Sequence, residues 1–158
     1  MPFCDLANQR EEGIFFQFTN LMNMGLRQRI TMLLHKFIKS GQLDVQSMDI
    51  ARAYMAFGGI TLYKTDKRWD TREKALAFIV KMKEPLYMAE AAALSDEEKQ
   101  RFHAANEYAS VYDPIIETDE QVLAFFISIG IMIPVTDDRY NTPLKAHIFL
   151  MMNSIPRD

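Results

Sequence analysis

The chain has 158 residues, of which 49% are hydrophobic and 25% charged, and its formal net charge is −3. These values are typical of a globular domain, and the six glycines and six prolines are few, so we expect residues 1–158 to form a single domain rather than a disordered chain or an all-β, turn-rich fold. The only cysteine, Cys4, excludes an internal disulfide and a zinc site built on cysteine pairs. The first residues do not have the pattern of a signal peptide, and no apolar run reaches the ~18 residues of a membrane span. We therefore expect a cytoplasmic protein that does not enter the membrane.

The net charge conceals a division along the chain. Residues 1–83 carry 13 Lys and Arg against 8 Asp and Glu, a balance of +5, whereas residues 84–158 carry 5 against 13, a balance of −8. No acidic residue occurs between Gly13 and Leu43. Such asymmetry can mark an exterior surface for a charged partner, or an internal seam between two halves of the fold, and the sequence leaves both open.

Helical periodicity begins close to the start of the chain. Residues 3–12 are polar and suit the first turns of a helix, and apolar residues then recur every three or four positions from 14 to 24. Gly25 is either a bend between two helices or a weak point in one long helix. Because this segment and the next each have an apolar face that needs a partner, we expect an antiparallel helix pair.

The best-defined helix is predicted for residues 26–39. Its apolar residues lie on one face, and Gly41 follows as a residue that ends helices. The opposite face carries the basic side chains Arg29, His35, Lys36 and Lys39. If the charge asymmetry is an internal seam, these cations should pair with carboxylates from residues 96–120. If it is external, they form a surface for a partner.

A helix is expected over residues 48–57, with Ser47 as its N-cap and the glycines at 58 and 59 ending it. Residues 60–63 are β-branched and aromatic, which predicts an extended segment. A helix-turn-helix motif is disfavoured, because the preceding connection is too long and Arg52 is the only basic residue on the candidate recognition helix.

The next helix is predicted to begin with a capping box in which Asp70 is the N-cap and Glu73 the third helical residue. It should run to about Lys83, because Pro85 then ends it or begins another helix. Residues 86–94 are rich in alanine and predict that following helix.

Two further capping boxes start at Ser95 and Thr118, and they predict helices over residues 96–111 and from about 119 to 129. The segment 122–129 is apolar nearly all round, so its helix should be central in the fold. Thr142 and the proline after it predict the start of a last helix.

Residues 131–135 are expected to be extended, and Pro134 limits them to one pairing, with residues 60–63. The fold class that follows is all-α for most of the chain: a compact bundle of about seven to eight helices, with or without one short two-stranded β element.

A second basic cluster, together with the cations of residues 26–39, suits a polyanion because charge attracts phosphates and flat rings stack on bases. The alternative is a solvated charged face in which Trp69 anchors the loop to the core, and the pI of about 5.6 is low for a nucleic-acid-binding domain. The second cluster comprises Lys64, Lys67, Arg68, Trp69 and Arg72.

The second half of the chain contains an acidic group that could steer a basic partner. Several of its members also lie at predicted helix starts, where they would stabilise the helix dipole, so both roles remain open. The group comprises Asp96, Glu97, Glu98, Glu107, Asp113, Glu117, Asp119 and Glu120.

No sequence motif indicates a particular enzymatic reaction. The histidines at 35, 103 and 147 are far apart in the sequence, and no metal-binding or phosphate-binding spacing occurs, so we predict no catalytic residue, metal or cofactor. The eleven methionines suit either an adaptable core or a groove that accepts several partners.

We therefore hypothesise a non-enzymatic, small cytosolic regulator or inhibitor that binds a protein through segregated charged surfaces. One alternative is a nucleic-acid-binding regulator that uses the two basic clusters. Another is an enzyme whose pocket is assembled from scattered residues. The sequence does not determine whether the chain is a monomer or forms a homo-oligomer.

Overall fold

The computed structural model describes residues 24–109 and 116–154, and both ranges are largely helical. The predicted helical segment before residue 24 lies outside the described residues. No helix of the described ranges combines the length and apolarity needed to cross a membrane. In chain order the elements are α2 (Met24–Ser40), α3 (Val45–Phe57), the 3-10 helix η1 (Thr61–Thr65), α4 (Arg72–Ala92), α5 (Asp96–Ala109), α6 (Asp119–Ser128) and α7 (Pro143–Ser154).

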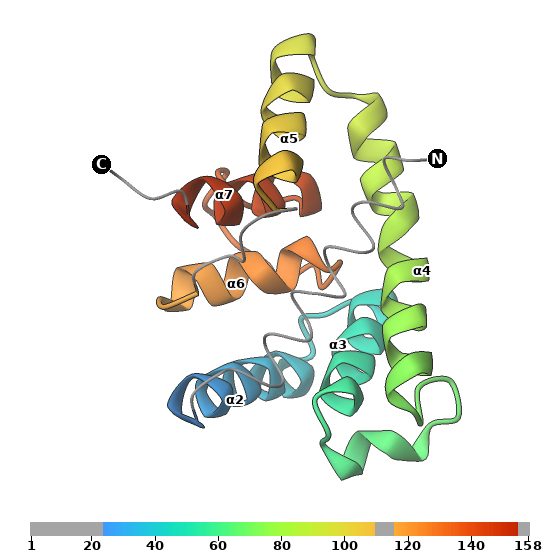
Figure 1. The fold of residues 1–158 in the computed structure, drawn as a ribbon. Coiled ribbons are helices and arrows are strands. Elements are labelled where there is room, and N and C mark those ends of the chain that lie inside the picture. Colours follow the sequence, from blue (N-terminus) through green and yellow to red (C-terminus); the bar gives the residue numbers. More distant parts are fainter. Residues whose placement is uncertain (1–23, 110–115, 155–158) are drawn as a thin grey trace.

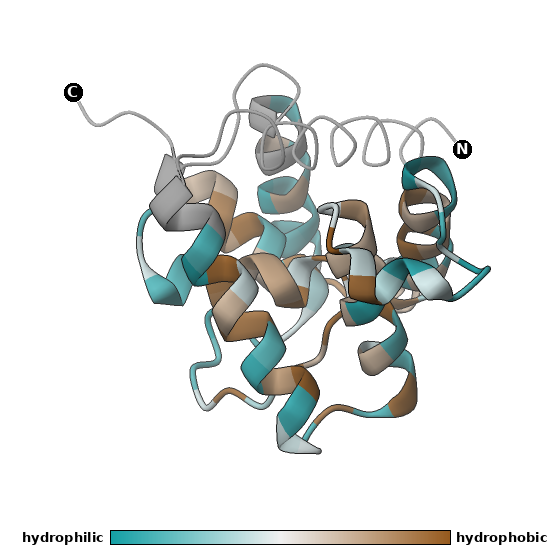
Figure 2. Cartoon of the chain, turned by 90° about the horizontal axis from the view of Figure 1, so that it is seen from below, coloured by the Kyte–Doolittle hydropathy of each residue, from teal (hydrophilic) through white to brown (hydrophobic). Residues whose placement is uncertain are grey.

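The long helix α4 runs along one side of the molecule (Figure 1). Helix α3 packs against α4, and α2 packs against α3. In the other half of the molecule, α6 packs against α7, and α7 also contacts α5 and α4. Hydrophilic turns lie at the outer ends of several helices, as Figure 2 shows.

Helix α6 lies in the centre of the fold, as its nearly uninterrupted apolar sequence predicted. Residues 124–128 are all buried. Tyr54 of α3 meets α6 edge-on, with its ring centroid 5.7 Å from that of Phe125 and 6.4 Å from that of Phe126. Such edge-to-face pairs add to the stabilisation from burial alone.

The end of α6 is closed by a Schellman motif centred on Gly130. The N–H of Gly130 donates to the carbonyl of Ile127, and the N–H of Ile131 donates to that of Phe126, both at 3.0 Å. Gly130 has φ +100°, and a Cβ there would lie 3.1 Å from Cδ1 of Ile50. A glycine is therefore required both by the backbone conformation and by the close approach of α3.

Three predicted helix starts are confirmed. Ser95 and Glu98 exchange hydrogen bonds between side chain and backbone N–H in a capping box. Thr118 and Gln121 do the same at α6. The hydroxyl of Thr142 accepts a hydrogen bond from the first turn of α7.

Two predicted N-caps are wrong by one or more residues. Helix α4 is capped by Thr71, while Asp70 forms a surface ion pair with a lysine of the first turn. Helix α3 is capped by Asp44, whose carboxylate accepts the N–H of Ser47 at 2.7 Å. Ser47 is buried instead, and its hydroxyl accepts the N–H of Met132 at 2.9 Å. Where several residues near a helix start could each act as the N-cap, tertiary contacts of this kind determine which one does.

The prediction that Pro85 separates two helices is also wrong, because α4 continues through it to Ala92. Proline removes one helical hydrogen bond, to the carbonyl of Lys81. Both residues are exposed, so water can satisfy that carbonyl. The described residues thus contain six α-helices rather than seven to eight.

The predicted β element is not formed by residues 60–63 and 131–135. Residues 61–65 form η1 instead. The carbonyl of Tyr63 accepts the indole N–H of Trp69 at 2.9 Å, and the N–H of Met132 is bonded to the Ser47 hydroxyl. Local turns and side chains therefore satisfy the backbone groups that a strand pairing would have used.

Candidate functional site

The basic side chains predicted on α2 have two different environments. Arg29 pairs with Asp119 at 3.0 Å and also donates to the carbonyl of Glu117. By contrast, Lys36 and Lys39 are exposed, and neither forms an ion pair with a described carboxylate. The positive charge of α2 is therefore paired within the molecule at Arg29, on the surface between α2 and α6, and is unpaired among the described residues at Lys36 and Lys39.

The basic cluster after η1 is largely occupied by intramolecular contacts. Arg68 pairs with Asp49 at 3.1 Å and with Asp66 at 2.8 Å, and Arg72 lies 4.6 Å from the ring centroid of Phe57. Lys64 and Lys67, the other cations of the cluster, are exposed.

Trp69 was predicted either to stack on a ligand or to anchor the loop, and the anchoring interpretation is confirmed. Its side chain is 1% exposed. Its ring packs edge-on against Phe78, with centroids 4.9 Å apart, and its indole N–H is bonded to the Tyr63 carbonyl. A buried ring cannot stack on a base, so Trp69 is removed from the candidate polyanion site.

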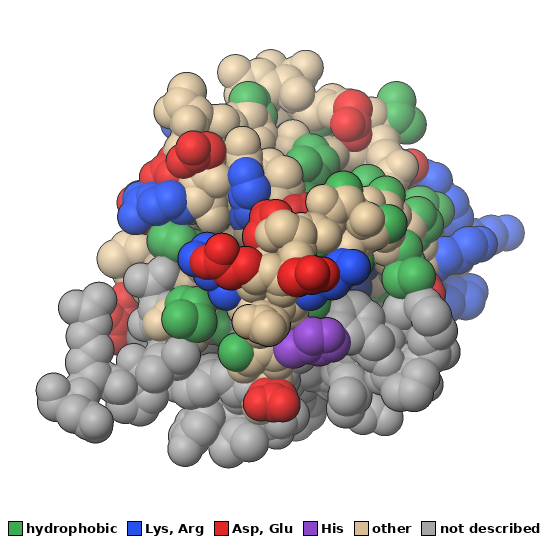
Figure 3. Space-filling model, turned by 90° about the horizontal axis from the view of Figure 1, so that it is seen from above, with side chains coloured by type: hydrophobic (Ala, Val, Ile, Leu, Met, Phe, Trp, Pro, Cys, Tyr) green, Lys and Arg blue, Asp and Glu red, His purple; other side chains and the backbone are tan. Residues whose placement is uncertain are grey.

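The predicted acidic group does not form one patch among the described residues. Residues 96–98 begin α5 at the top of Figure 1, whereas residues 117–120 lie at the start of α6 beside α2. Glu107 is near the end of α5, and Asp113 lies outside the described residues. Acidic and basic side chains also lie next to each other on the face shown in Figure 3. Charge is therefore less segregated than the sequence predicted.

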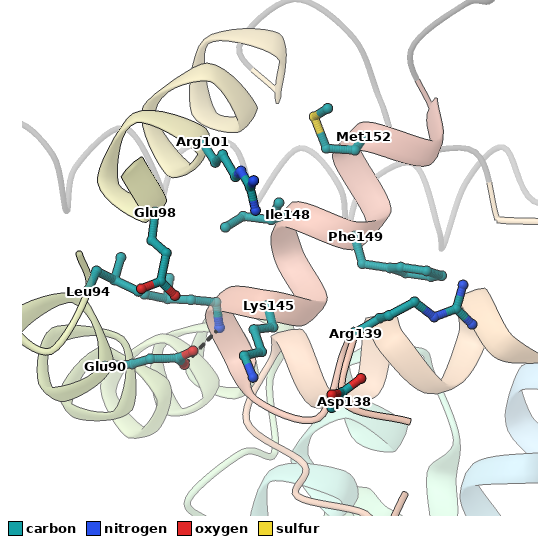
Figure 4. Close-up of a pocket in the computed structure, with 11 residues that line it drawn as sticks. Glu90, Leu94, Glu98, Arg101, Asp138, Arg139, Lys145, Ile148, Phe149 and Met152 are labelled. Atoms are coloured by element: carbon teal, nitrogen blue, oxygen red, sulfur yellow. Dashed lines mark hydrogen bonds between the residues drawn. The ribbon is translucent and has the colours of Figure 1, made fainter. Parts of the chain in front are cut away.

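A pocket that the sequence did not predict opens between the end of α4, α5, the loop before α7, and α7 itself (Figure 4). We call it the α7 pocket, and its volume is about 290 Å³. Its apolar lining consists of Leu94, Leu144, Ile148, Phe149 and Met152, and its charged lining of Glu90, Glu98, Arg101, Asp138, Arg139 and Lys145.

The apolar base of the pocket is firmly held. Leu144 is fully buried in a small cluster with Tyr87 and Phe102, and Ile148 packs against this cluster. The ring of Phe149 is half-buried; its centroid is 5.0 Å from that of Tyr140. Met152, one turn beyond Ile148, is 52% exposed. The stripe of apolar side chains along α7 thus leads from the core out to the solvent.

Glu90 holds the start of α7 against the last turns of α4. Its carboxylate accepts hydrogen bonds from the hydroxyl of Thr142 and, at 3.0 Å, from the N–H of Leu144. A carboxylate at a helix N-terminus satisfies free N–H groups and interacts favourably with the helix dipole. One residue therefore sets the position of the helix that forms the pocket base.

The rim of the pocket is charged but electrically balanced, with three acidic and three basic lining residues. Arg139 pairs with Asp137 at 2.6 Å and with Glu120 at 2.8 Å, and its hydrogen bonds hold the pKa of the Asp137 carboxyl below its usual value. Arg101 pairs with Glu97 at 2.9 Å. Because these pairs are exposed, each contributes little to stability and is available for exchange with a ligand.

His35 and His147 contact aromatic side chains. His35 is hydrogen-bonded to the Tyr63 hydroxyl at 2.9 Å, and His147 is buried with its ring centroid 5.8 Å from that of Phe102. No histidine belongs to the described lining of the α7 pocket. The described ranges also contain no group of three His, Cys, Asp or Glu side chains that could hold a metal ion.

The α7 pocket could have been suspected from the sequence by one signal. Lys145, Ile148, Phe149 and Met152 follow the spacing of a single helix face, and three of these four residues are apolar. The spacing of residues along α7 does not, however, predict that α5 and the loop before α7 lie beside this face.

No family model, curated protein or solved structure matches this chain. No functional residue is therefore carried over from a relative. The function has to be argued from the shape and charge of the surfaces described above.

Proposed function

We propose that this chain is a non-enzymatic binding protein whose α7 pocket receives apolar side chains of a partner protein. The observation that supports it is the half-exposed stripe of Ile148, Phe149 and Met152 at the base of a hollow with charged walls. Protein interfaces commonly combine an apolar centre with a polar rim, and their affinity comes from a few central side chains.

The size of the pocket favours a side chain over a larger ligand. Its volume of about 290 Å³ lies at the lower end of the ~300–1,000 Å³ range of small-molecule sites. Its base is held by Tyr140 and the cluster beneath Leu144, so little ordering entropy would be lost on binding. The balanced rim would orient a partner by the positions of its charges rather than attract it by net charge.

A protein of this kind would act as a small regulator or inhibitor by covering part of its partner's surface. We propose the reducing cytoplasm as its compartment, because a chain with the single cysteine Cys4 has no internal disulfide to preserve.

The test uses two matched variants of the full chain. Met152→Glu places a charge in the apolar stripe at a half-exposed position, whereas Val45→Glu makes the same kind of change at an 81% exposed position on α3. Proteins captured from a lysate by immobilised wild type are identified, and the affinity of the most enriched one is measured by titration calorimetry. We expect Met152→Glu to weaken it at least 30-fold, about 2 kcal/mol, and Val45→Glu to leave it unchanged.

Thermal unfolding of the three proteins provides the folding control. Equal affinity for wild type and Met152→Glu, with both proteins folded, would refute the α7 pocket as the docking site. Failure of wild type to retain any protein above the background of an unrelated helical domain would refute the binding function itself.

A further inference from the structure

The two basic clusters that are separate in the sequence meet in the fold. The Nδ1 atom of His35 on α2 lies 2.9 Å from the hydroxyl oxygen of Tyr63 in η1, so these elements are in direct contact. Lys39 follows His35 by four residues and therefore lies on the same face of α2, and Lys64 follows Tyr63 directly. The hydrogen bond thus brings Lys39 of the first cluster and Lys64 of the second onto neighbouring parts of the surface.

Most acidic groups near this surface are already engaged. Asp49 and Asp66 both pair with Arg68, and Asp70 pairs with Lys74 at 3.0 Å. The other cations here are exposed, and none forms an ion pair with a described carboxylate. We call this set the cationic face, and it comprises Lys36, Lys39, Arg52, Lys64 and Lys67.

The positive charge of Arg52 helps to lower the pKa of a carboxyl group next to η1. The pKa of the Asp66 carboxyl is held below its usual value, mainly by hydrogen bonds from Arg68 and also by the positive charge of Arg52. Helix α3, which carries Arg52, also packs against η1, so three elements contribute to one positive region.

We infer that the cationic face binds an acidic segment of a protein. Carboxylate side chains complement its lysines and arginine, and the 69% exposed Leu62 in η1 offers an apolar contact between them. This inference is independent of the α7 pocket, since α7 lies in the upper half of Figure 1 and η1 at the bottom.

A protein segment fits this face better than a nucleic acid. Trp69 is buried, and Tyr63 is half-buried and bonded to His35, so neither ring is free to stack on bases. Asp66 and Asp70, although paired with Arg68 and Lys74, are still partly exposed beside these lysines, and a duplex carrying a charge every ~1.7 Å would meet them. Separate carboxylates on a peptide can avoid these acids.

The experiment measures fluorescence anisotropy of labelled probes with the full chain at 20 and 200 mM salt. The probes are a 12-residue peptide of four Glu-Glu-Leu repeats, the matching peptide with Gln in place of Glu, a 12-nucleotide single strand and a 12-base-pair duplex. We expect the Glu peptide to bind at low salt and to weaken about tenfold or more at 200 mM, because exposed charges are screened. The Gln peptide should not bind.

Paired variants locate the binding surface. Lys39→Gln with Lys64→Gln should weaken the Glu peptide at least tenfold. Lys81→Gln with Lys99→Gln makes the same change of charge at exposed positions outside the face and should have less than a twofold effect. The inference is overturned by absence of peptide binding at 20 mM salt, by equal effects of the two double variants, or by either nucleic acid binding as tightly as the Glu peptide.

Discussion

Replacing Gly130 with alanine perturbs the junction on which the centre of the fold depends. The residue has φ +100°, and an added Cβ would meet Cδ1 of Ile50 at 3.1 Å and Cδ1 of Leu86 at 3.5 Å. Gly41, at the end of α2, is the matched control, because its φ is +73° but no atom lies within 4 Å of the added Cβ. The pair therefore separates backbone strain from crowding.

The expected magnitudes follow from these two terms. A left-handed conformation costs a residue with a Cβ about 1–2 kcal/mol, so Gly41→Ala should lower the free energy of unfolding by roughly that amount. Crowding in a packed core adds about 1–3 kcal/mol, so Gly130→Ala should lose roughly 2–5 kcal/mol in all. At about 2–4 °C per kcal/mol for a chain of this size, the larger loss lowers Tm by roughly 10 °C.

Urea unfolding followed by circular dichroism at 222 nm measures both losses, and an unchanged slope with denaturant shows that the comparison is two-state. Equal losses for Gly130→Ala and Gly41→Ala would refute the close packing of α3 and α4 around the end of α6.

Two further predictions concern the contacts of α4 with α7 and with α6. Glu90→Ala should lower stability by about 1–3 kcal/mol in urea unfolding, because the partly buried N–H of Leu144 and the Thr142 hydroxyl lose their acceptor; a Glu90→Ala protein as stable as wild type would contradict this role. Burial raises the pKa of Tyr87, whose hydroxyl donates to the carbonyl of Ser128 at 2.7 Å, so its phenolate absorbance should be missing while the protein is folded. The stability that the neutral Tyr87 hydroxyl provides is complete below about pH 10 and is lost as the pH rises above that value. Above pH 10, wild type should therefore lose stability more steeply than Tyr87→Phe. Ionisation of all tyrosines near pH 10 in the folded protein would disprove the raised pKa of Tyr87.

Local sequence rules succeeded where neighbouring residues alone set the structure. The capping boxes at Ser95 and Thr118 need only side chains three residues apart, and the apolar segment that became α6 has no polar face to expose. Gly130 ends that helix because few other residues adopt its φ. These features were predictable because their energies arise within one or two turns of helix.

The tertiary structure decided which of several locally acceptable solutions is used. Pro85 stays within α4 because the helix packs on both sides of it. Residues 61–65 form the 3-10 helix η1 rather than a strand, and Trp69 and His35 bond to its Tyr63. The tertiary structure also divided the charges, since Arg29 pairs with Asp119 at the start of α6, whereas Lys36 and Lys39 are exposed and form no ion pair with a described carboxylate.

The order of the amino acids was enough to predict a mostly helical chain, the ends of most of its helices, and a positive first half followed by a negative second half. Only the packing of distant segments formed the α7 pocket and joined α2 to η1 into a cationic face. The reason is physical: helix propensity and capping act over a few residues, whereas a pocket and a surface potential depend on which side chains from remote helices become neighbours.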